Sequence, residues 1–405
     1  MAAADLTIVT PWYPTPEHPF GGAFVASQVA ALTDAGYQVD VIHTQERDLL
    51  RAKPGFGPLR PRWRAWLERN GADWGPTDDP YGGGARLVRI PVPRRSGAPV
   101  AELARLHRDA TATAVRRLGG WGRLVHAHVG ALSGFAVAGL APARTPVVTT
   151  EHYSRIHRIL RRPVGRAVYA QSLLRADAFI TVGESLRRDI LGRMPWADHM
   201  EVLPNVVALP GVVPRETPPE SLRRWICVGA LIERKRPELA MKAFEIFGRA
   251  NPDATLTFVG SGELADGLAR KATDLAIGDR VEFLGGLPPE DAIRVIRDSD
   301  LLVHLSSRET FGVVVAEALG CGTPVIATRS GGPEEILDSE LEPIAGMILD
   351  VDIDAEMVAH SASQLQDRLA TLQPALAAAE CSRRYSPASI AERLVDVYTR
   401  VGWKP

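Results

Sequence analysis

The stretch SSRETFGVVVAEALGCGTPVIAT, residues 306–328, places a glutamate on each side of a strand-to-helix turn. The apolar run DLLVHLSS at 300–307 and the run TPVIAT at 323–328 are typical of short buried strands. Glu309 falls in the turn, and Glu317 falls inside the helix that joins the two strands. A strand, a helix and a further strand in succession predict a parallel α/β unit.

The same alternation of strand-like and helix-like runs extends over the whole chain. The strand-like runs lie at 5–14, 37–44, 86–93, 123–129, 145–152 and 177–185, and then at 223–231, 255–262, 280–287, 300–307 and 323–332. A proline-rich stretch at 206–220 separates the two sets. We therefore predict two doubly wound, Rossmann-like domains, 1–210 and 211–386, with a ligand site in the cleft between them. The last helix, about 387–405, is expected to pack back on the first domain.

Length, charge and cysteine content narrow the class of protein. At 405 residues, 45% of them hydrophobic, the chain is long enough for two cored domains. The net charge is −1, but residues 1–200 hold 26 Arg or Lys against 17 Asp or Glu, whereas the remainder holds 21 against 31. This asymmetry favours an anionic partner for the first half, and the basic residues are too dispersed for nucleic acid.

Further features indicate the compartment. No run approaches the roughly 18 apolar residues that a membrane span needs, and the N-terminus lacks a basic leader. Three widely spaced cysteines indicate neither a disulfide framework nor a zinc site. We expect a cytoplasmic protein with no transmembrane segment. The oligomeric state stays open.

One segment, residues 48–85, departs from the alternation because it is rich in Pro, Gly, Arg and Trp. We predict a long loop around one short helix at 62–71. Such insertions often contact substrates, but a surface excursion without a role is equally compatible with the composition.

The helix that follows Glu309 predicts an anion site. A helix N-terminus presents unpaired N–H groups and partial positive charge, so residues 310–313 suit a diphosphate. Glu309 and Glu317 can then hold hydroxyls of the groups at its two ends, such as a sugar and a ribose. The alternative is a simple strand-to-helix junction with two solvated glutamates.

The stretch 308–328, with SGGPEEIL at 330–337, resembles the donor-site signature of glycosyltransferase family 4, whose members are retaining enzymes with the GT-B fold. Similar landmarks follow one another along almost the whole chain. They are GG at 21–22, VHAH at 125–128, TTEH at 149–152, ITVGESLRRDI at 180–190, VLPN at 202–205, CVGALIERKRPELAMKAF at 227–244, LTFVGSGEL at 256–264 and VEFLGGLPPED at 281–291.

The resemblance implies roles for residues of the second half. Glu309 resembles the glutamate that contacts the transferred sugar, Glu317 the residue that binds the ribose, and Lys235 the lysine that neutralises the donor diphosphate. The backbone of Thr310, Phe311, Gly312, Val313 and Val314 resembles the phosphate cradle. Family members often have Arg after Gly229, where this chain has Ala230, and Arg234 or Arg236 is the expected substitute. Gly285 to Leu287 should lie near the nucleobase, with uracil and guanine both open.

In the first half, Gly21 and Gly22 resemble loop glycines that approach the diphosphate, and His152 resembles an active-site histidine that faces the donor sugar. The donor substrate implied is a nucleoside-diphosphate sugar, and no cofactor is expected. We predict no metal site. The pairs Asp350/Asp352, Asp298/Asp300 and His126/His128 look like ligands but lack a suitable position or a third partner.

For the reaction, the resemblance implies glycosyl transfer with retention, in which Glu309 binds substrate and does not act as a base. Arg155, Arg158, Arg162 and Arg166 recur at helical spacing after His152 and predict a basic face for an anionic acceptor or a lipid surface. A solvated arginine face is the alternative. A nucleotide-sugar 2-epimerase of the same fold and a non-catalytic sugar-nucleotide sensor also remain compatible with the sequence. The acceptor itself stays open among polar metabolites, natural-product intermediates and glycan or lipid-linked acceptors.

Overall fold

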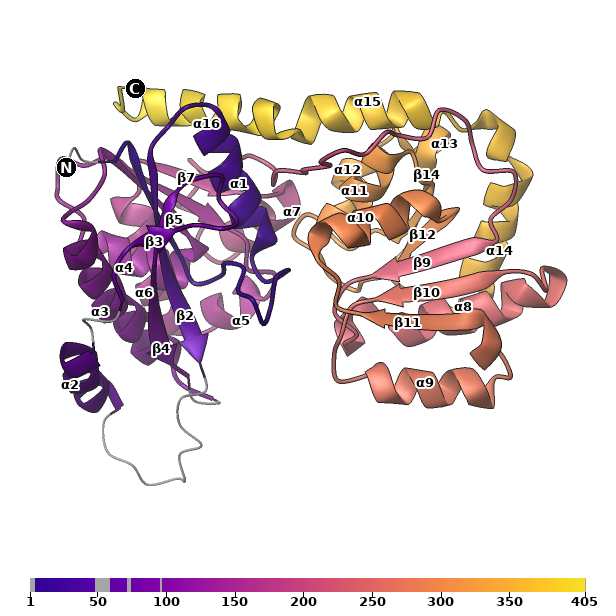
Figure 1. Cartoon of the computed structure of the whole chain (residues 1–405), viewed down its shortest axis with the longest axis horizontal. Coiled ribbons are helices and arrows are strands. Elements are labelled where there is room, and N and C mark those ends of the chain that lie inside the picture. Colours follow the sequence, from indigo (N-terminus) through magenta and orange to yellow (C-terminus); the bar gives the residue numbers. More distant parts are fainter. Residues whose placement is uncertain (1–3, 48–58, 71–73, 95–96, 405) are drawn as a thin grey trace. The chain divides into compact units, whose positions relative to one another are not determined.

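The computed structural model describes residues 4–47, 59–70, 74–94 and 97–404 (Figure 1). It divides into two compact units. Unit 1 comprises residues 1–182, 186–206 and 390–405, and unit 2 comprises residues 183–185 and 207–389. In the described ranges, no helix combines the length and the apolarity that crossing a membrane requires.

Unit 1 is built on an eight-stranded sheet with the order β3-β4-β2-β1-β5-β6-β7-β8. Every neighbouring pair is parallel except β3 and β4, which are antiparallel. The strands are β1 Leu6–Thr10, β2 Val39–Arg47, β3 Thr77–Asp78, β4 Arg86–Pro93, β5 Leu124–His128, β6 Val147–Glu151, β7 Ala178–Thr181 and β8 Glu201–Val202. The helices are α1 Ala23–Asp34, α2 Leu59–Asn70, α3 Val100–Leu118, the π-helix η2 Val129–Gly134, α4 Phe135–Ala138, α5 Ile156–Leu160, α6 Pro163–Arg175, α7 Glu184–Leu191 and α16 Pro387–Arg400.

Unit 2 is built on a six-stranded, fully parallel sheet with the order β11-β10-β9-β12-β13-β14. Its strands are β9 Arg224–Val228, β10 Thr255–Val259, β11 Val281–Gly285, β12 Leu301–His304, β13 Val325–Thr328 and β14 Gly346–Leu349. Its helices are η3 Glu233–Lys235, α8 Pro237–Ala250, α9 Ala265–Asp274, η4 Gly278–Arg280, α10 Pro289–Asp298, α11 Val313–Cys321, α12 Pro333–Ile336, α13 Glu342–Ala345, α14 Ala355–Asp367, η5 Leu369–Thr371 and α15 Pro374–Tyr385. Both sheets confirm the predicted doubly wound α/β class.

Each sheet has one point at which the direction of chain progression reverses. In unit 2 the chain starts at β9, moves outward to β11, and returns to β12 on the other side of β9. In unit 1 the corresponding reversal lies between β1 and β5. The loops at the carboxyl ends of such strand pairs diverge and leave a crevice, which is where ligands of open α/β sheets bind. The segments 229–235 and 305–312 in unit 2, and 11–22 in unit 1, leave strands at these points.

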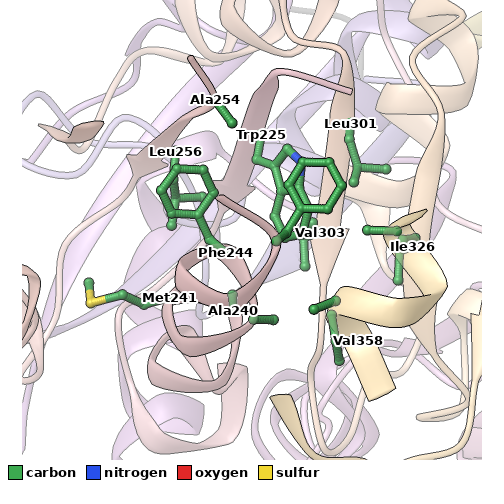
Figure 2. Packing of buried hydrophobic residues seen from close by; sticks show 14 of the residues in the cluster. Trp225, Ala240, Met241, Phe244, Ala254, Leu256, Leu301, Val303, Ile326 and Val358 are labelled. Atoms are coloured by element: carbon green, nitrogen blue, oxygen red, sulfur yellow. The ribbon is translucent and has the colours of Figure 1, made fainter. Parts of the chain in front are cut away.

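Trp225 on β9 anchors the core of unit 2 (Figure 2). Its indole is 1% exposed, lies 4.9 Å from the Phe247 ring between centroids, and donates its N–H to the carbonyl of Leu222 at 2.9 Å. The cluster around it joins α8, α14 and the strands of the sheet. Because the N–H is satisfied locally, the whole indole can be buried without a desolvation penalty for its polar atom.

The sequence did not predict three short strands, β3, β8 and β14, and it placed the helix of the 48–85 segment at 62–71. The structure has α2 at Leu59–Asn70 and pairs β3 with β4. Residues 48–58 and 71–73 of this segment lie outside the described residues. In the described part, Trp63 of α2 is buried in the core of unit 1, so this helix belongs to the packed domain.

We predict that Trp225→Ala lowers the free energy of unfolding of the chain by about 3–5 kcal/mol, because it leaves a large cavity in unit 2. Trp225→Phe should cost less, mainly through the unsatisfied carbonyl of Leu222. Urea denaturation followed by circular dichroism measures both changes. Trp196→Ala is the matched control, since this tryptophan is 49% exposed and its loss should change stability by about 0.5 kcal/mol or less.

Candidate functional site

The loops that follow β9 and β12 meet around a single carboxylate, that of Glu309. Its side chain is 10% exposed. Oε1 accepts hydrogen bonds from Lys235 Nζ at 2.5 Å and from Arg234 Nη1 at 3.1 Å. It also accepts from Ser306 Oγ at 2.6 Å, and His304 Nε2 lies 3.4 Å away. Every one of these contacts is made to Oε1, and no contact to the second carboxylate oxygen, Oε2, is found among the residues that the structure describes.

These contacts keep Glu309 ionised. Burial by itself works to raise its pKa, but the positive charges of Lys235 and Arg234, with the nearby His304, hold the pKa well below the usual range of a glutamate. Burial and the neighbouring Lys235 lower the pKa of His304, which is therefore neutral. A carboxylate with so low a pKa is a poor proton acceptor at neutral pH, but it is a strong hydrogen-bond acceptor for a hydroxyl.

Backbone hydrogen bonds join the two loops that supply this cluster. The N–H of Ser307 donates to the carbonyl of Arg234 at 2.8 Å, and Arg234 Nη1 returns a bond to the carbonyl of Arg308 at 2.6 Å. The N–H of Glu309 donates to the carbonyl of Ser330 at 2.8 Å. Three segments therefore fix the position of one carboxylate.

The two candidates for the missing second basic contact behave differently. Arg234 joins the Glu309 cluster. Arg236 instead has a left-handed backbone, with φ of 51°, caps α8, and donates to the carbonyl of Val351 at 2.5 Å. Arg234 therefore lies beside Lys235 at Glu309, whereas Arg236 caps α8.

The anion cradle predicted from the sequence corresponds to the N-terminus of α11. This helix begins at Val313. Its cap, Gly312, has a backbone φ of 91°, which residues other than glycine rarely adopt. The N–H of Val315 is the first to bond back, to the carbonyl of Gly312 at 2.8 Å. The N–H groups of Val313 and Val314 precede it and have no partner within the helix. Thr310 and Phe311 form the turn that leads to this cap.

Glu317 lies four residues after the start of the same helix, in a very different environment. No hydrogen bond or ion pair to its carboxylate is recorded in the described ranges, and the side chain is partly buried. Burial raises its pKa to about 7. The same helix therefore presents one strongly ionised carboxylate just before its start and one weakly acidic carboxyl group inside it.

The remaining predicted positions of unit 2 lie at the ends of neighbouring strands. Gly229 follows β9 directly, Gly285 ends β11, and Leu287 follows two residues later. The N–H of Gly229 donates to the carbonyl of Val259, and the N–H of Gly260 donates to that of Gly285. These bonds align the strand ends at one edge of the sheet.

In unit 1, Gly22 has a structural reason to be glycine. Its φ is 72°, it caps α1, and a Cβ atom there would lie 2.4 Å from the backbone of Trp12. The loop itself therefore requires glycine at this position. Gly21 is less constrained, since a Cβ would lie 3.3 Å from the carbonyl oxygen of His18.

His152 lies directly after β6 and is 8% exposed. Its Nε2 lies 2.8 Å from Nδ1 of His128, and its ring lies 4.6 Å from the ring of Phe24 between centroids. Burial, followed by the influence of His128, lowers its pKa well below the usual value, and a hydrogen bond with Asn205 opposes this shift. His152 is therefore a neutral imidazole.

Sequence reasoning missed Glu151, which holds the loop that carries His152. This fully buried carboxylate accepts the N–H groups of His152 at 2.9 Å, of Tyr153 at 2.8 Å and of Gly130 at 3.1 Å. It also missed Ser306 and His304 beside Glu309. A buried acid at the end of an apolar strand, in TTEH, was the available signal for Glu151.

The predicted basic helical face after His152 is wrong in its geometry. α5 ends at Leu160 and α6 begins at Pro163, whose missing N–H and fixed φ suit a helix start. Arg166 turns back and donates to the carbonyl of Leu160 at 2.9 Å. The exposed arginines are those of the junction, Arg158, Arg161 and Arg162, whereas Arg155 is partly buried.

In each pair rejected as metal ligands, at least one side chain contacts another residue. Asp300 accepts from Arg224 at 2.7 Å, and Asp350 lies 4.0 Å from Arg329. The imidazoles of His126 and His128 bond to neighbouring side chains of unit 1. No group of three or more His, Cys, Asp or Glu side chains with metal-binding geometry occurs in the described ranges.

Two doubly wound sheets, with a helix N-terminus and a nearly buried carboxylate at the reversal point of the second, define a protein of the doubly wound α/β class. Residues 21–206 match the family described as "Glycosyl transferase 4-like domain", and residues 214–373 match "Glycosyl transferases group 1". The chain belongs to this family of glycosyltransferases, which confirms the resemblance drawn from the motifs.

Relatives of known name match part of the chain. The D-inositol 3-phosphate glycosyltransferase of Corynebacterium kroppenstedtii is 32% identical over 178 residues, which is 42% of this chain and 39% of the relative. The GDP-mannose-dependent alpha-(1-6)-phosphatidylinositol monomannoside mannosyltransferase of Mycolicibacterium smegmatis is 34% identical over 139 residues, 32% of this chain and 35% of the relative. The chain thus spans well under half the length of these two relatives.

Similar solved structures match nearly the whole chain. Sucrose-phosphate synthase from Thermosynechococcus elongatus has a TM-score of 0.73 at 18% identity, covering 98% of this chain and 99% of that one. Anabaena HepE in complex with UDP has a TM-score of 0.67 at 18% identity, covering 98% and 100%. These likenesses confirm the predicted GT-B fold.

Because the pKa of Glu317 is raised in the folded chain, we predict that the free energy of unfolding depends on pH. Between pH 4.5 and about 7 the folded chain keeps a proton that the unfolded chain has lost, so the free energy of unfolding falls as pH rises through this window. Glu317→Gln should remove this loss and stabilise the ligand-free chain above pH 7 by up to about 3 kcal/mol. Urea titrations of both proteins from pH 4.5 to 8.5 measure the difference.

Glu282→Gln, at an exposed position, is the control and should leave no pH-dependent difference. If the difference in free energy of unfolding between Glu317→Gln and the parent chain stays constant with pH, the raised pKa of Glu317 is contradicted.

Proposed function

We propose that this chain transfers a glycosyl group from a nucleoside-diphosphate sugar to an acceptor with retention of anomeric configuration. The observation that supports this most directly is the Glu309 cluster beside the N-terminus of α11. It combines an ionised carboxylate, two cations and N–H groups that have no partner within α11, at the reversal point of one sheet. A sugar with a diphosphate needs these three kinds of partner.

The donor's diphosphate is placed at the N-terminus of α11, with Lys235 and Arg234 beside it. The UDP complex of the structural neighbour HepE supports a nucleotide in this fold. Glu317, whose carboxylate has no partner among the described residues, holds the ribose hydroxyls. The backbone from Gly285 to Leu287 lies near the base.

In the reaction, the bond between the anomeric carbon and the diphosphate oxygen breaks while the acceptor hydroxyl attacks on the same face. The departing diphosphate oxygen takes the acceptor's proton. Lys235, Arg234 and the α11 N-terminus stabilise the negative charge that develops on the leaving group. Glu309 does not act as the base, because its pKa is too low, and instead holds sugar hydroxyls through its available oxygen. These positive groups supply the charge stabilisation without a metal.

From unit 1, the glycine loop at 21–22 approaches the diphosphate and His152 faces the donor sugar. The neutral state of His152 suits hydrogen bonding to a hydroxyl or a ring oxygen. We place the activity in the cytoplasm, in keeping with three cysteines that are all free thiols.

The acceptor is proposed to carry a phosphate. The names of several relatives refer to inositol 3-phosphate or phosphatidylinositol compounds. In this chain, residues 153–175 contain six arginines and no acidic residue. The exposed side chains of Arg158, Arg161 and Arg162 suit a phosphate group, either on a free polyol or on a lipid at a membrane surface.

The test begins with the donor. One nucleoside diphosphate among UDP, GDP and ADP should raise the melting temperature, by the equivalent of about 2.7 kcal/mol at 100 times its dissociation constant. With the matching sugar nucleotide, Glu309→Gln should keep nucleotide binding but lower kcat roughly 10²-fold, because the amide cannot give the sugar the same charge-assisted acceptor. Undiminished turnover of Glu309→Gln would refute its assigned role.

Two controls separate the functions. Glu317→Ala should weaken the nucleotide-induced shift without affecting the fold, and activity should persist after treatment with a chelator. Release of a free 2-epimeric sugar without an acceptor would favour an epimerase. Absence of any nucleotide-induced shift at millimolar concentration would contradict the donor site.

The arginine surface predicts a salt-dependent acceptor KM. Arg158→Ala combined with Arg162→Ala should raise the KM for a phosphorylated acceptor about tenfold or more, since each charge-assisted contact contributes roughly 1.5 kcal/mol. The dependence of this KM on ionic strength should decrease, while kcat changes little. Arg144→Ala, an exposed arginine of unit 1 outside this segment, is the control. An unchanged KM and salt dependence would mean that these arginines are merely solvated.

A further inference from the structure

A chain of buried hydrogen bonds runs behind His152. We call it the histidine chain and define it as Tyr398, His126, Gln28, His128 and His152. All five residues belong to unit 1, and their side chains come from α16, β5, α1 and the end of β6. None is more than 8% exposed. The rings of His126 and His128 stack at 4.5 Å between centroids, because alternate residues of a strand share a face.

The hydroxyl of Tyr398 determines in which direction the hydrogen bonds of this chain are donated. Its hydroxyl is fully buried and lies 2.7 Å from Nδ1 of His126, the one hydrogen-bond partner recorded for it in the described ranges. Burial raises the pKa of this phenol, so the proton stays on it. A buried O–H needs an acceptor, and therefore Nδ1 of His126 must offer its lone pair. The proton of His126 then sits on Nε2, 2.7 Å from Thr150 Oγ1.

Gln28 links the tautomer of His126 to that of His128. Its amide nitrogen lies 3.3 Å from Nδ1 of His126 and 3.5 Å from Nε2 of His128. Because the first of these atoms is an acceptor, the amide must present its NH₂ group there and not its oxygen. The second N–H of the same group then points to Nε2 of His128, which makes that atom an acceptor as well.

The last link reaches His152. With Nε2 of His128 unprotonated, its proton sits on Nδ1, which lies 2.8 Å from Nε2 of His152. His152 must accept this bond, so its own proton sits on Nδ1.

The backbone at both ends of this last link is also fixed. Glu151 accepts the N–H of His152 and that of Gly130, which follows His128 by two residues. Val129, which lies between His128 and Gly130, has φ of 73°, an unfavourable conformation for a β-branched residue. Such strain persists where surrounding structure over-determines a position, and it is enriched at functional sites.

We propose that His128 is a positioning residue that holds His152 in the tautomer with its proton on Nδ1. Gln28 and Tyr398 act behind it and set the direction of the chain. His152 thereby presents a hydrogen-bond donor of fixed orientation, suited to an oxygen of the sugar donor and not to a hydroxyl proton. The choice of substrate partner rests on the proposed function, whereas the tautomer does not.

Nitrogen NMR of the full chain labelled with ¹⁵N-histidine tests the tautomer directly. The parent protein should show His152 protonated on Nδ1 and unprotonated on Nε2. A resonance pattern with the proton on Nε2 would overturn the proposal. This measurement needs no substrate, so a failure of the proposed function, seen as no turnover with any sugar nucleotide, is distinguishable from it.

Variants then test the positioning role. His128→Leu removes the donor to His152, and a second tautomer should appear while kcat falls roughly 10²-fold with little change in the donor's dissociation constant. His128→Asn places an amide N–H near the former Nδ1 and should restore both the single tautomer and most of the kcat. Leu and Asn variants that are equally active, or a His152 pattern unchanged in His128→Leu, would overturn the proposal.

Two further variants guard against misfolding. Tyr398→Phe removes a single hydroxyl, and it should also produce a second His152 tautomer. If His128→Leu does not fold, Tyr398→Phe provides the test. Unchanged nitrogen resonances of His152 in that variant would overturn the proposed role of the histidine chain. His107→Leu is the matched control, because His107 is equally buried in unit 1 and bonded to Thr44 at 2.8 Å. It should lower stability without altering the His152 signals or kcat.

Discussion

Glu309 is ionised although it is nearly buried, and the surrounding loops are built to satisfy that charge. An isolated carboxylate in such a place would take up a proton, because desolvation disfavours its charged form. Lys235 and Arg234 prevent this, and both come from the loop after β9, while Glu309 comes from the loop after β12. The charge thus joins the two loops that flank the reversal point of the sheet. Two cations therefore surround one carboxylate, which leaves a net positive charge at the reversal point.

Unit 1 uses neutral groups for a comparable purpose. Burial lowers the pKa of His128 to about 3, so the imidazoles there remain uncharged and are held by directional hydrogen bonds. The carboxyl group of Glu151 fixes the backbone beside them, although burial raises its pKa. A chain of neutral groups avoids the desolvation cost of buried charge. It fixes the orientation of its rings as strictly as ion pairs would, since each neutral imidazole has only one acceptor nitrogen. Unit 2 therefore orders its residues around a charge, whereas unit 1 orders its residues by directional hydrogen bonds.

The sequence predicted the features that depend on local pattern, and it failed where tertiary register decides. The strand-to-helix junction at Glu309 follows from apolar runs and a helix start, and Lys235 follows from the family resemblance. Ser306 was not predicted, because a serine at the end of a strand is common and only its distance to Oε1 gives it a role. Gln28 and Tyr398 were missed for the same reason, as 370 positions separate them along the chain.

The expected basic face shows why spacing alone misleads. Arginines at 155, 158, 162 and 166 fit a helical period, but Pro163 lacks an N–H and starts a new helix. Arg166 then satisfies carbonyls at the end of α5 instead of facing solvent. Proline thus divides the pattern into a structural arginine and an exposed cluster at the junction. The exposed cluster retains the chemistry that was expected of the whole face, and its position is determined by the helix break and not by the helical period.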